Sequence, residues 1–495
     1  MSNKIYPIGI QNFEKIRNDG YFYIDKTALM YQMVKTGSYY FLSRPRRFGK
    51  SLLISTLEAY FQGKKELFEG LAVEKLEKDW IKHPILHLDL NIEKYDTPES
   101  LDKILNDNLE YWESQYGTRP SETSFSLRFA GIIQRACEKT GQRVVILVDE
   151  YDKPMLQAIG NEELQKQFRN TLKPFYGALK TKDGYIKFAL LTGVTKFGKV
   201  SVFSDLNNLD DISMWNEYVE ICGVSEREIH ENLEAELHEF AAARGITYDK
   251  LCEDLRECYD GYHFTHNSIG MYNPFSLLNA FKRKEFGSYW FETGTPTYLV
   301  KLLKKHHYDL ERMAHEETDV QVLNSIDSES TNPIPVIYQS GYLTIKGYDE
   351  EFGMYRLGFP NREVEEGFIR FLLPFYANVN KVESPFEIQK FVREVRSGDY
   401  NSFFRRLQSF FADTTYEVIR DQELHYENVL FIVFKLLGFY TKVEYHTSEG
   451  RIDLVLQTDK FIYIMEFKLN GTAEEALQQI NDKHCLLYTS DAADD

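Results

Sequence analysis

Short apolar runs alternate with longer amphipathic stretches over the first 215 residues of the chain. This alternation is typical of an α/β domain, in which strands and helices follow one another in sequence. We expect strands at four of the apolar runs, residues 39–42, 85–90, 143–148 and 187–191. The last three are apolar with almost no interruption, as strands are when helices cover both faces of a parallel sheet. The pattern therefore predicts a parallel sheet in this part of the chain.

After residue 215 the pattern becomes helical, with acidic amphipathic segments such as 226–244. Three aromatic-rich segments, YDGYHF, YNPFSLLNAF and YWFETGTPTYL, interrupt these helices. Aromatic side chains usually belong to a core, and a partner surface is the alternative. From residue 421 the chain is predicted to form a helix, a strand, a hairpin and a second helix. The predicted parts are an α/β domain (1–215), a mostly helical middle region (216–415), a second α/β domain (416–484) and an aberrant tail (485–495).

Composition narrows the class of protein. The chain is 43% hydrophobic, and it has no apolar run near the roughly 20 residues that cross a bilayer. Its N-terminus lacks the apolar core of a signal peptide, so we expect a soluble cytoplasmic protein without membrane contact. Five cysteines without C-x-x-C spacing favour a reducing compartment and argue against structural zinc. A net charge of −18 means that any nucleic acid would have to meet a local basic patch.

The stretch FLSRPRRFGKSLL, residues 41–53, places glycine, lysine and serine between a predicted strand and a predicted helix, 51–61. In a phosphate-binding loop, backbone N–H groups and a helix N-terminus surround the phosphates, lysine neutralises charge and a hydroxyl binds Mg²⁺. Gly49, Lys50 and Ser51 meet these requirements. A basic turn before an ordinary helix is the alternative interpretation.

Arg44 stands where the general motif G-x-x-x-x-G-K-[ST] has its first glycine. A side chain resists the positive φ that glycine adopts readily, at a cost of about 1–2 kcal/mol. Pro45 stiffens the turn further. We therefore expect a reshaped loop, in which Arg44, Arg46 and Arg47 add positive charge around the phosphates.

Two later strands end in residues suited to nucleotide chemistry. RVVILVDE ends in Asp149, which would bind Mg²⁺, and Glu150, which would act on a water that attacks the γ-phosphate. KFALLTG carries Thr192 near its end, where a hydroxyl would sense the γ-phosphate or position water. The alternative is that these are ordinary polar residues at strand ends. Because all three elements lie at the carboxyl ends of predicted parallel strands, where open α/β sheets bind ligands, we favour nucleotide binding.

Four stretches together resemble one protein family: residues 6–27, SRPRRFGKSLL (43–53), ILVDEYDKP (146–154) and LTGVTKF (191–197). They are similar to the predicted AAA-ATPase-like proteins common in gut bacteria, and the similarity extends to about residue 484. The arginine-rich loop without its first glycine is that family's own pattern. The resemblance implies a P-loop domain in which Lys50, Ser51, Asp149 and Glu150 take the roles given above. We expect ATP and Mg²⁺ as cofactors, with the nucleotide held by Arg47, Phe48, Gly49, Lys50, Ser51, Leu52, Asp149 and Thr192.

Residues 450–469 are predicted to form two strands joined by a turn near residues 458–461. If the turn is centred between Asp459 and Lys460, Asp453 lies opposite Glu466, and Lys468 shares their face. Two opposed carboxylates repel each other unless a cation such as Mg²⁺ lies between them, and Lys468 would then assist hydrolysis of a phosphodiester. The alternative is a set of surface charges with an incidental salt bridge.

This hairpin resembles the PD-(D/E)XK nuclease superfamily, which implies that Asp453 and Glu466 bind Mg²⁺ and that Lys468 is catalytic. The helix before it, residues 423–438, is predicted to end at Gly438, a glycine that can take the left-handed cap position. After the hairpin, Thr472 and Glu475 are predicted to form a capping box that starts a helix. Weaker candidates are Glu423 and Glu427, with solvated charge as the alternative, then Glu444 and, from the resemblance, Gln479.

The expected function is therefore an ATP-binding and ATP-hydrolysing protein that also carries a metal-dependent nuclease-like domain acting on DNA or RNA. The alternative is a regulatory or binding protein in which nucleotide acts as a switch and the nuclease fold is degenerate. The tail CLLYTSDAADD does not continue as the relatives do, so we expect a truncated nuclease-like domain. Oligomerisation stays open at this point.

Overall fold

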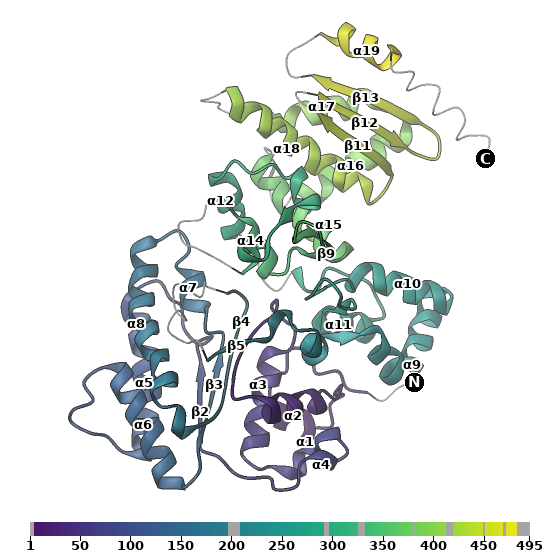
Figure 1. Ribbon diagram of the computed structural model, residues 1–495. Helices are drawn as coiled ribbons and strands as arrows, with labels where there is room; N and C mark the ends of the chain where they lie inside the picture. The colour runs from purple at the N-terminus through teal and green to yellow at the C-terminus, as the bar shows by residue number, and fades with distance from the viewer. Residues whose placement is uncertain are drawn as a thin grey trace. The chain divides into compact units, whose positions relative to one another are not determined.

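The computed structural model describes residues 4–196, 208–291, 297–324, 332–377, 379–380, 383–411, 419–448, 451–468 and 472–482. The chain divides into two compact units (Figure 1). Unit 1 comprises Met1–Leu299 and Glu316–Glu363, and unit 2 comprises Val300–His315 and Val364–Asp495. The four sequence ranges given above remain a proposed division of the chain.

A five-stranded parallel sheet forms the centre of the N-terminal part of unit 1. Its order is β2-β3-β4-β1-β5, so β4 lies between β1 and β3. The apolar runs form the strands of this sheet, where helices on both faces bury their side chains. Every residue of β3 is buried, and every residue of β4 except one. The predicted parallel sheet is thus confirmed, with strands β1 (Tyr39–Ser43), β2 (Ile85–Asp89), β3 (Val144–Asp149), β4 (Ile186–Gly193) and β5 (Asp210–Asp211).

Helices cover both sides of this sheet (Figure 1). One side holds α5 (Pro98–Tyr116), α6 (Phe125–Thr140) and α8 (Glu162–Thr181), which pack against one another. The other side holds α3 (Lys50–Phe61), which contacts β3 and β4. With it lie α1 (Phe13–Asn18), α2 (Thr27–Thr36) and α4 (Ala72–Leu76).

The remainder of unit 1 is helical with small sheets. Helices α9 (Glu226–Arg244), α10 (Tyr248–Tyr259) and α11 (Pro274–Arg283) enclose one apolar core. Tyr6, Phe22 and Ile24 of the N-terminal segment pack against that core. The short strands β6 (Val224–Ser225) and β7 (Met271–Tyr272) pair antiparallel, as do β8 (Glu317–Thr318), β9 (Thr344–Asp349) and β10 (Met354–Gly358).

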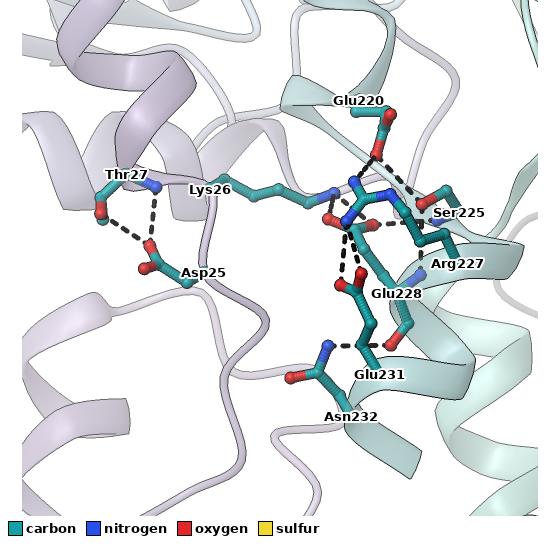
Figure 2. A network of polar contacts seen from close by, with 9 residues as sticks. All are labelled: Asp25, Lys26, Thr27, Glu220, Ser225, Arg227, Glu228, Glu231 and Asn232. Carbon is teal, nitrogen blue, oxygen red and sulfur yellow. Dashed lines mark hydrogen bonds and ion pairs between the residues drawn. The ribbon is translucent and has the colours of Figure 1, made fainter. Parts of the chain in front are cut away.

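A polar network attaches the N-terminal segment to the start of α9 (Figure 2). The Lys26 ammonium lies 2.5 and 2.6 Å from the two carboxylate oxygens of Glu228, a side chain that is buried. Glu228 also forms a capping box with Ser225. Around it, Arg227 pairs with Glu220 and Glu231, Asn232 bonds the Glu228 carbonyl, and Thr27 bonds Asp25. The sequence motif containing Lys26 therefore holds two parts of unit 1 together.

Unit 2 ends in an antiparallel sheet between two helices. Its sheet has the order β11-β12-β13, and β12 pairs with β13 so that Asp453 is opposite Glu466, as predicted. Thr472 and Glu475 form the predicted capping box. The elements are α15 (Arg362–Tyr376), α16 (Ser384–Ser397), α17 (Tyr400–Phe411), α18 (Ile419–Gly438), β11 (Lys442–Ser448), β12 (Arg451–Gln457), β13 (Ile462–Lys468) and α19 (Ala473–Asp482).

The prediction that this helix ends at Gly438 is confirmed, whereas the left-handed conformation expected of that glycine is not observed. Helix α18 includes Gly438 as its last residue, and Gly438 is not among the glycines with positive φ. The chain leaves the helix one residue later, where the N–H groups of Tyr440 and Thr441 both donate to the Leu437 carbonyl at 2.9 Å. These two bonds close the helix end without a left-handed glycine.

Candidate functional site

The loop between β1 and α3 has the backbone of a phosphate-binding turn. Gly49 has a φ of 97°, in the left-handed region that favours glycine, and α3 begins at the next residue, Lys50. Arg47 has a φ of 66°, so the non-glycine residue under backbone strain is Arg47 and not Arg44. Such strain costs on the order of 1–3 kcal/mol and is concentrated at functional sites.

The prediction that Arg44 adds positive charge around a bound phosphate is wrong, because Arg44 is buried and does not line the pocket described below. It is only 1% exposed, and its guanidinium donates to the carbonyls of Ser43, Ser213 and Tyr218 at 2.7–3.1 Å. The ring of Phe264 lies 3.9 Å from it. Burial lowers the pKa of Arg44 to about 10, so the group stays charged at neutral pH. The arginine thus holds the loop against the following chain instead of presenting charge to a ligand.

Arg46 and Arg47 lie against aromatic rings. The Arg46 guanidinium is 4.6 Å from the centre of the Trp290 ring and 5.9 Å from that of Tyr342. The Arg47 guanidinium is 5.2 Å from the centre of the Phe275 ring. These rings belong to the aromatic-rich segments of the middle region and to residues just before β9, so those segments pack onto the loop.

Lys50 points back into its own loop. Its ammonium donates to the carbonyls of Arg44 and Pro45 at 3.0 and 3.3 Å, and it lies 3.6 Å from a carboxylate oxygen of Glu150. Glu150 has a φ of 53°, the second strained position of this site. The predicted lysine and the predicted catalytic acid are therefore adjacent.

The carboxyl ends of β1, β4 and β3 bring the other predicted residues together. Thr192 is fully buried, and its hydroxyl donates to Asp149 Oδ1 at 2.6 Å. The same oxygen accepts the backbone N–H of Glu150 at 3.1 Å. Asp149 is 4% exposed, and these two hydrogen bonds to Oδ1 fix the orientation of its carboxylate. Thr192 thus contacts Asp149, and neither of these two residues lines the pocket described below.

Asp152 connects the end of β3 with the chain after β4. It is fully buried and accepts bonds from the N–H of Val194 and from the N–H and hydroxyl of Thr195. Burial raises the pKa of Asp152, and the charge of Glu150 raises it further. Asp152 therefore links the segment after β3 to the segment after β4 and stabilises the two strand ends that carry Asp149 and Thr192.

A pocket of about 500 Å³ opens at this edge of the sheet. Six of the candidate residues named from the sequence line it: Arg47, Gly49, Lys50, Ser51, Leu52 and Glu150. Over the described residues, four cationic side chains face it against one carboxylate: Arg46, Arg47, Lys50 and Lys153 against Glu150. A cationic pocket of this size in a chain of net charge −18 suits a polyanionic small molecule.

A smaller cavity of about 110 Å³ lies beside the pocket and shares five lining residues with it: Pro7, Gly49, Leu52, Pro274 and Leu278. The rest of its wall is mostly apolar and includes Phe22, Ile24, Met30, Phe48 and Val224. Phe48 is 1% exposed and packs edge-on against Tyr262 and Phe264. Of the predicted site residues, Phe48 thus lines only this apolar cavity.

Several residues that complete the pocket wall carry no recognisable motif in the sequence. They include residues 7–11 of the N-terminal segment, Asn91 after β2, Lys153 of α7 (Lys153–Gln157), Val194 after β4, Phe275 of α11 and Tyr342. No spacing pattern links them, because they come from six separate places in the chain. The one available signal was the family stretch at residues 6–27, which carries no recognisable chemistry of its own.

The C-terminal candidates lie on the hairpin and its neighbours. Besides the pairing of Asp453 with Glu466, the register places Arg451 opposite Lys468 and His446 of β11 opposite Asp453. Glu466 is partly buried. The side chains of Glu423, Glu444, Asp453, Lys468 and Gln479 lie outside the described part, as do residues 485–495. Among the side chains that are described, no group of three His, Cys, Asp or Glu converges as metal ligands.

The parallel sheet and its loop define an α/β protein with a phosphate-binding turn, to which the comparisons with known sequences add a family. Residues 7–203 match the family model described as Predicted AAA-ATPase, and residues 421–489 match the PD-(D/E)XK nuclease superfamily. A protein of Azotobacter chroococcum mcd 1, described as "Uncharacterized protein in vnfD 5'region", is 36% identical over 499 residues, covering 98% of this chain and 93% of that protein. The chain belongs to this predicted AAA-ATPase family and has a C-terminal PD-(D/E)XK nuclease-like domain.

In the described part of the chain, no helix is both long and apolar enough to cross a membrane.

Proposed function

We propose that unit 1 binds ATP in the 500 Å³ pocket and hydrolyses it. The observation that carries this proposal is that Lys50, Ser51 and Glu150, from two strand ends, line one pocket with four cations against a single carboxylate. A triphosphate supplies the negative charge that this wall needs.

The positions of the charged groups support the proposed hydrolysis. A water oxygen attacks the γ-phosphorus and gives its proton to Glu150, while the bond from the γ-phosphorus to the bridging oxygen breaks. ADP leaves with that electron pair, and inorganic phosphate remains. Lys50 must first exchange the carbonyls of Arg44 and Pro45 for phosphate oxygens, because its ammonium is bonded to both carbonyls. Binding of ATP therefore separates Lys50 from Glu150, which lie 3.6 Å apart.

The donor set also fits Mg²⁺. Ser51, which carries a hydroxyl, lines the pocket, and the Asp149 carboxylate at the end of β3 accepts bonds from Thr192 and the Glu150 N–H. Hydroxyl and carboxylate oxygens are the ligands that this hard cation prefers. When bound, the ion would neutralise charge on the phosphate oxygens.

The apolar cavity beside the pocket suits the base of the nucleotide. Its volume of about 110 Å³ and its walls of Phe22, Ile24 and Met30 match a flat ring with apolar faces. Since the cavity and the pocket share five lining residues, a single ligand would fill both. We therefore propose a purine nucleotide, with ATP as the ligand.

Binding and turnover are tested with Lys50→Ala and Glu150→Gln beside wild type. Calorimetry with Mg²⁺ and ATP should show binding that Lys50→Ala weakens at least about tenfold, which corresponds to the loss of one charged contact. Glu150→Gln should bind ATP but release phosphate about 10²-fold or more slowly. Lys103→Ala, on the exposed face of α5, is the matched control. ATP binding that survives Lys50→Ala would refute the phosphate-loop assignment.

For the C-terminal domain, we propose a metal-dependent nuclease in which Asp453 and Glu466 hold Mg²⁺ and Lys468 assists attack on a DNA or RNA phosphodiester. The register that pairs Asp453 with Glu466 supports this, because opposed carboxylates are stable together when a cation bridges them. Asp453→Ala should abolish cleavage of labelled DNA and RNA with Mg²⁺ or Mn²⁺, whereas Asp459→Ala, in the exposed turn, should not. If wild type cuts no substrate, the nuclease-like domain serves recognition instead.

A further inference from the structure

We propose that Arg46 is a catalytic arginine, supplied by the phosphate loop itself and held toward the terminal phosphate by Trp290 and Tyr342. This inference rests on the proposed ATP hydrolysis. It assigns a second cation, beside Lys50, to stabilisation of the charge that develops in the transition state.

Arg46 is fixed at the pocket wall by two aromatic residues. Tyr342 lines the pocket, and its hydroxyl accepts a bond from Arg46 Nη2 at 3.3 Å. Trp290 is fully buried behind the wall, with its ring centre 4.6 Å from the guanidinium. Its indole N–H donates to the Arg46 carbonyl at 3.0 Å. Both the backbone and the side chain of Arg46 are thus positioned from outside the loop.

The two aromatic residues are themselves held in place. The backbone N–H of Trp290 donates to Glu363 Oε1 at 2.6 Å. Gly341, just before Tyr342, approaches the loop so closely that a Cβ at this position would lie 2.6 Å from the Cβ of Pro45. Its φ of 88° also favours glycine. The segments that carry Trp290 and Tyr342 therefore pack against the loop through specific hydrogen bonds and close backbone packing.

Comparison of the three loop arginines singles out Arg46. Arg44 is turned away and bonded to carbonyls, and it does not line the pocket. Arg47 lines the pocket but is exposed. Arg46 is partly buried and lines the same pocket as Lys50 and Glu150. A charged group shielded from water interacts more strongly with developing charge than an exposed one.

The chemistry needs such a group. As the water oxygen bonds to the γ-phosphorus and the bond to the bridging oxygen breaks, negative charge spreads over the terminal and leaving oxygens. A planar guanidinium donates two parallel N–H groups to such oxygens. In other nucleotide hydrolases an arginine in this role is worth about 10³–10⁵ in kcat. Trp290 and Tyr342 act as positioning residues, because they act through their contacts with Arg46.

The test uses the full chain with Arg46→Ala, Arg46→Lys and Tyr342→Phe. Phosphate release gives kcat, and calorimetry gives the dissociation constants of ATP and of ADP with aluminium fluoride, which mimics the transition state. Arg119→Ala, an exposed arginine after α5, controls for loss of charge. Melting temperatures of all variants identify any that fail to fold.

We expect Arg46→Ala to lower kcat by about 10²-fold or more while ATP affinity changes less than about tenfold. Affinity for ADP with aluminium fluoride should fall in proportion to kcat, and added millimolar guanidinium should restore part of the turnover. Arg46→Lys should keep ATP binding but recover little turnover, because one ammonium cannot donate two parallel bonds. Tyr342→Phe should lower kcat a few fold without weakening ATP binding.

The inference is overturned if Arg46→Ala keeps the turnover of Arg119→Ala. It is equally overturned if Arg46→Ala loses turnover only in step with ATP binding, with no rescue by guanidinium, since Arg46 then serves the loop's structure alone. Absence of turnover in wild type would instead refute the proposed hydrolysis. This outcome is distinguishable from failure of the inference about Arg46, because it is measured on wild type alone.

Discussion

Arg44 and Arg46 are two positions apart and have opposite surroundings. Arg44 is enclosed by protein carbonyls, whereas Arg46 lies at the pocket wall. The loop itself could be predicted from Gly49, Lys50 and Ser51, because their roles depend on local backbone geometry. The roles of the arginines could not, since the groups that bind them lie 169, 174 and 244 residues along the chain in Ser213, Tyr218 and Trp290.

Arg44→Ala should destabilise unit 1 by roughly 2–4 kcal/mol. The substitution leaves the buried carbonyls of Ser213 and Tyr218 without their donor and removes the contact with Phe264. The measurement is the urea midpoint of unfolding, compared with Arg119→Ala. An unchanged midpoint for Arg44→Ala would show that the guanidinium does not hold the loop.

Glu77 makes the free energy of unfolding of unit 1 depend on pH in the acid range. Burial by itself would raise its pKa, but bonds from Tyr60, from the N–H groups of Asp79 and Lys78 and from Lys35 outweigh burial and lower the pKa to about 2. The stabilisation by ionised Glu77 is therefore present above its ordinary pKa of 4.5 and is lost as the pH falls toward 2.

Glu77→Gln should flatten the fall in stability between about pH 5 and pH 2, by on the order of 1–3 kcal/mol. Urea midpoints of wild type and Glu77→Gln at a series of pH values measure this difference. Curves that run parallel through this range would show that Glu77 is not the responsible group.

Strands and their order along the chain could largely be read from the sequence. The apolar runs predicted the four main strands of the sheet, and the turn position in the hairpin predicted its register. Both follow from local patterns, namely continuous burial and a fixed number of residues per pairing. Gly438 shows what local patterns cannot predict. The end of the helix was predicted, but its capping was not, because hydrogen bonds from the residues after the helix close its end in place of a left-handed glycine.

The attachment of the N-terminal segment to α9 gives a test of its own. Glu228→Gln should cost about 2–4 kcal/mol, because it leaves the Lys26 ammonium without its carboxylate and weakens the capping box. Replacing both partners, Lys26→Met with Glu228→Leu, should recover part of that loss, since no buried charge remains. Equal stability of the single and the double variant would contradict this role of the pair.

The whole chain combines two units, each with its own proposed site. The nucleotide pocket is built only from unit 1, and the carboxylate hairpin lies in unit 2. We therefore expect Asp453→Ala to leave ATP turnover unchanged while it removes cleavage of nucleic acid. Phosphate release by Asp453→Ala measures this, and a loss of turnover would mean that the two sites depend on each other.

The central claim is that the pocket at the phosphate loop binds ATP. Its most direct test is the calorimetric dissociation constant of ATP with Mg²⁺ for wild type and Lys50→Ala. The account predicts saturable one-site binding by wild type, weakened at least about tenfold in Lys50→Ala and unchanged in Lys103→Ala. Absence of binding by wild type, or equal affinity in wild type and Lys50→Ala, would contradict it.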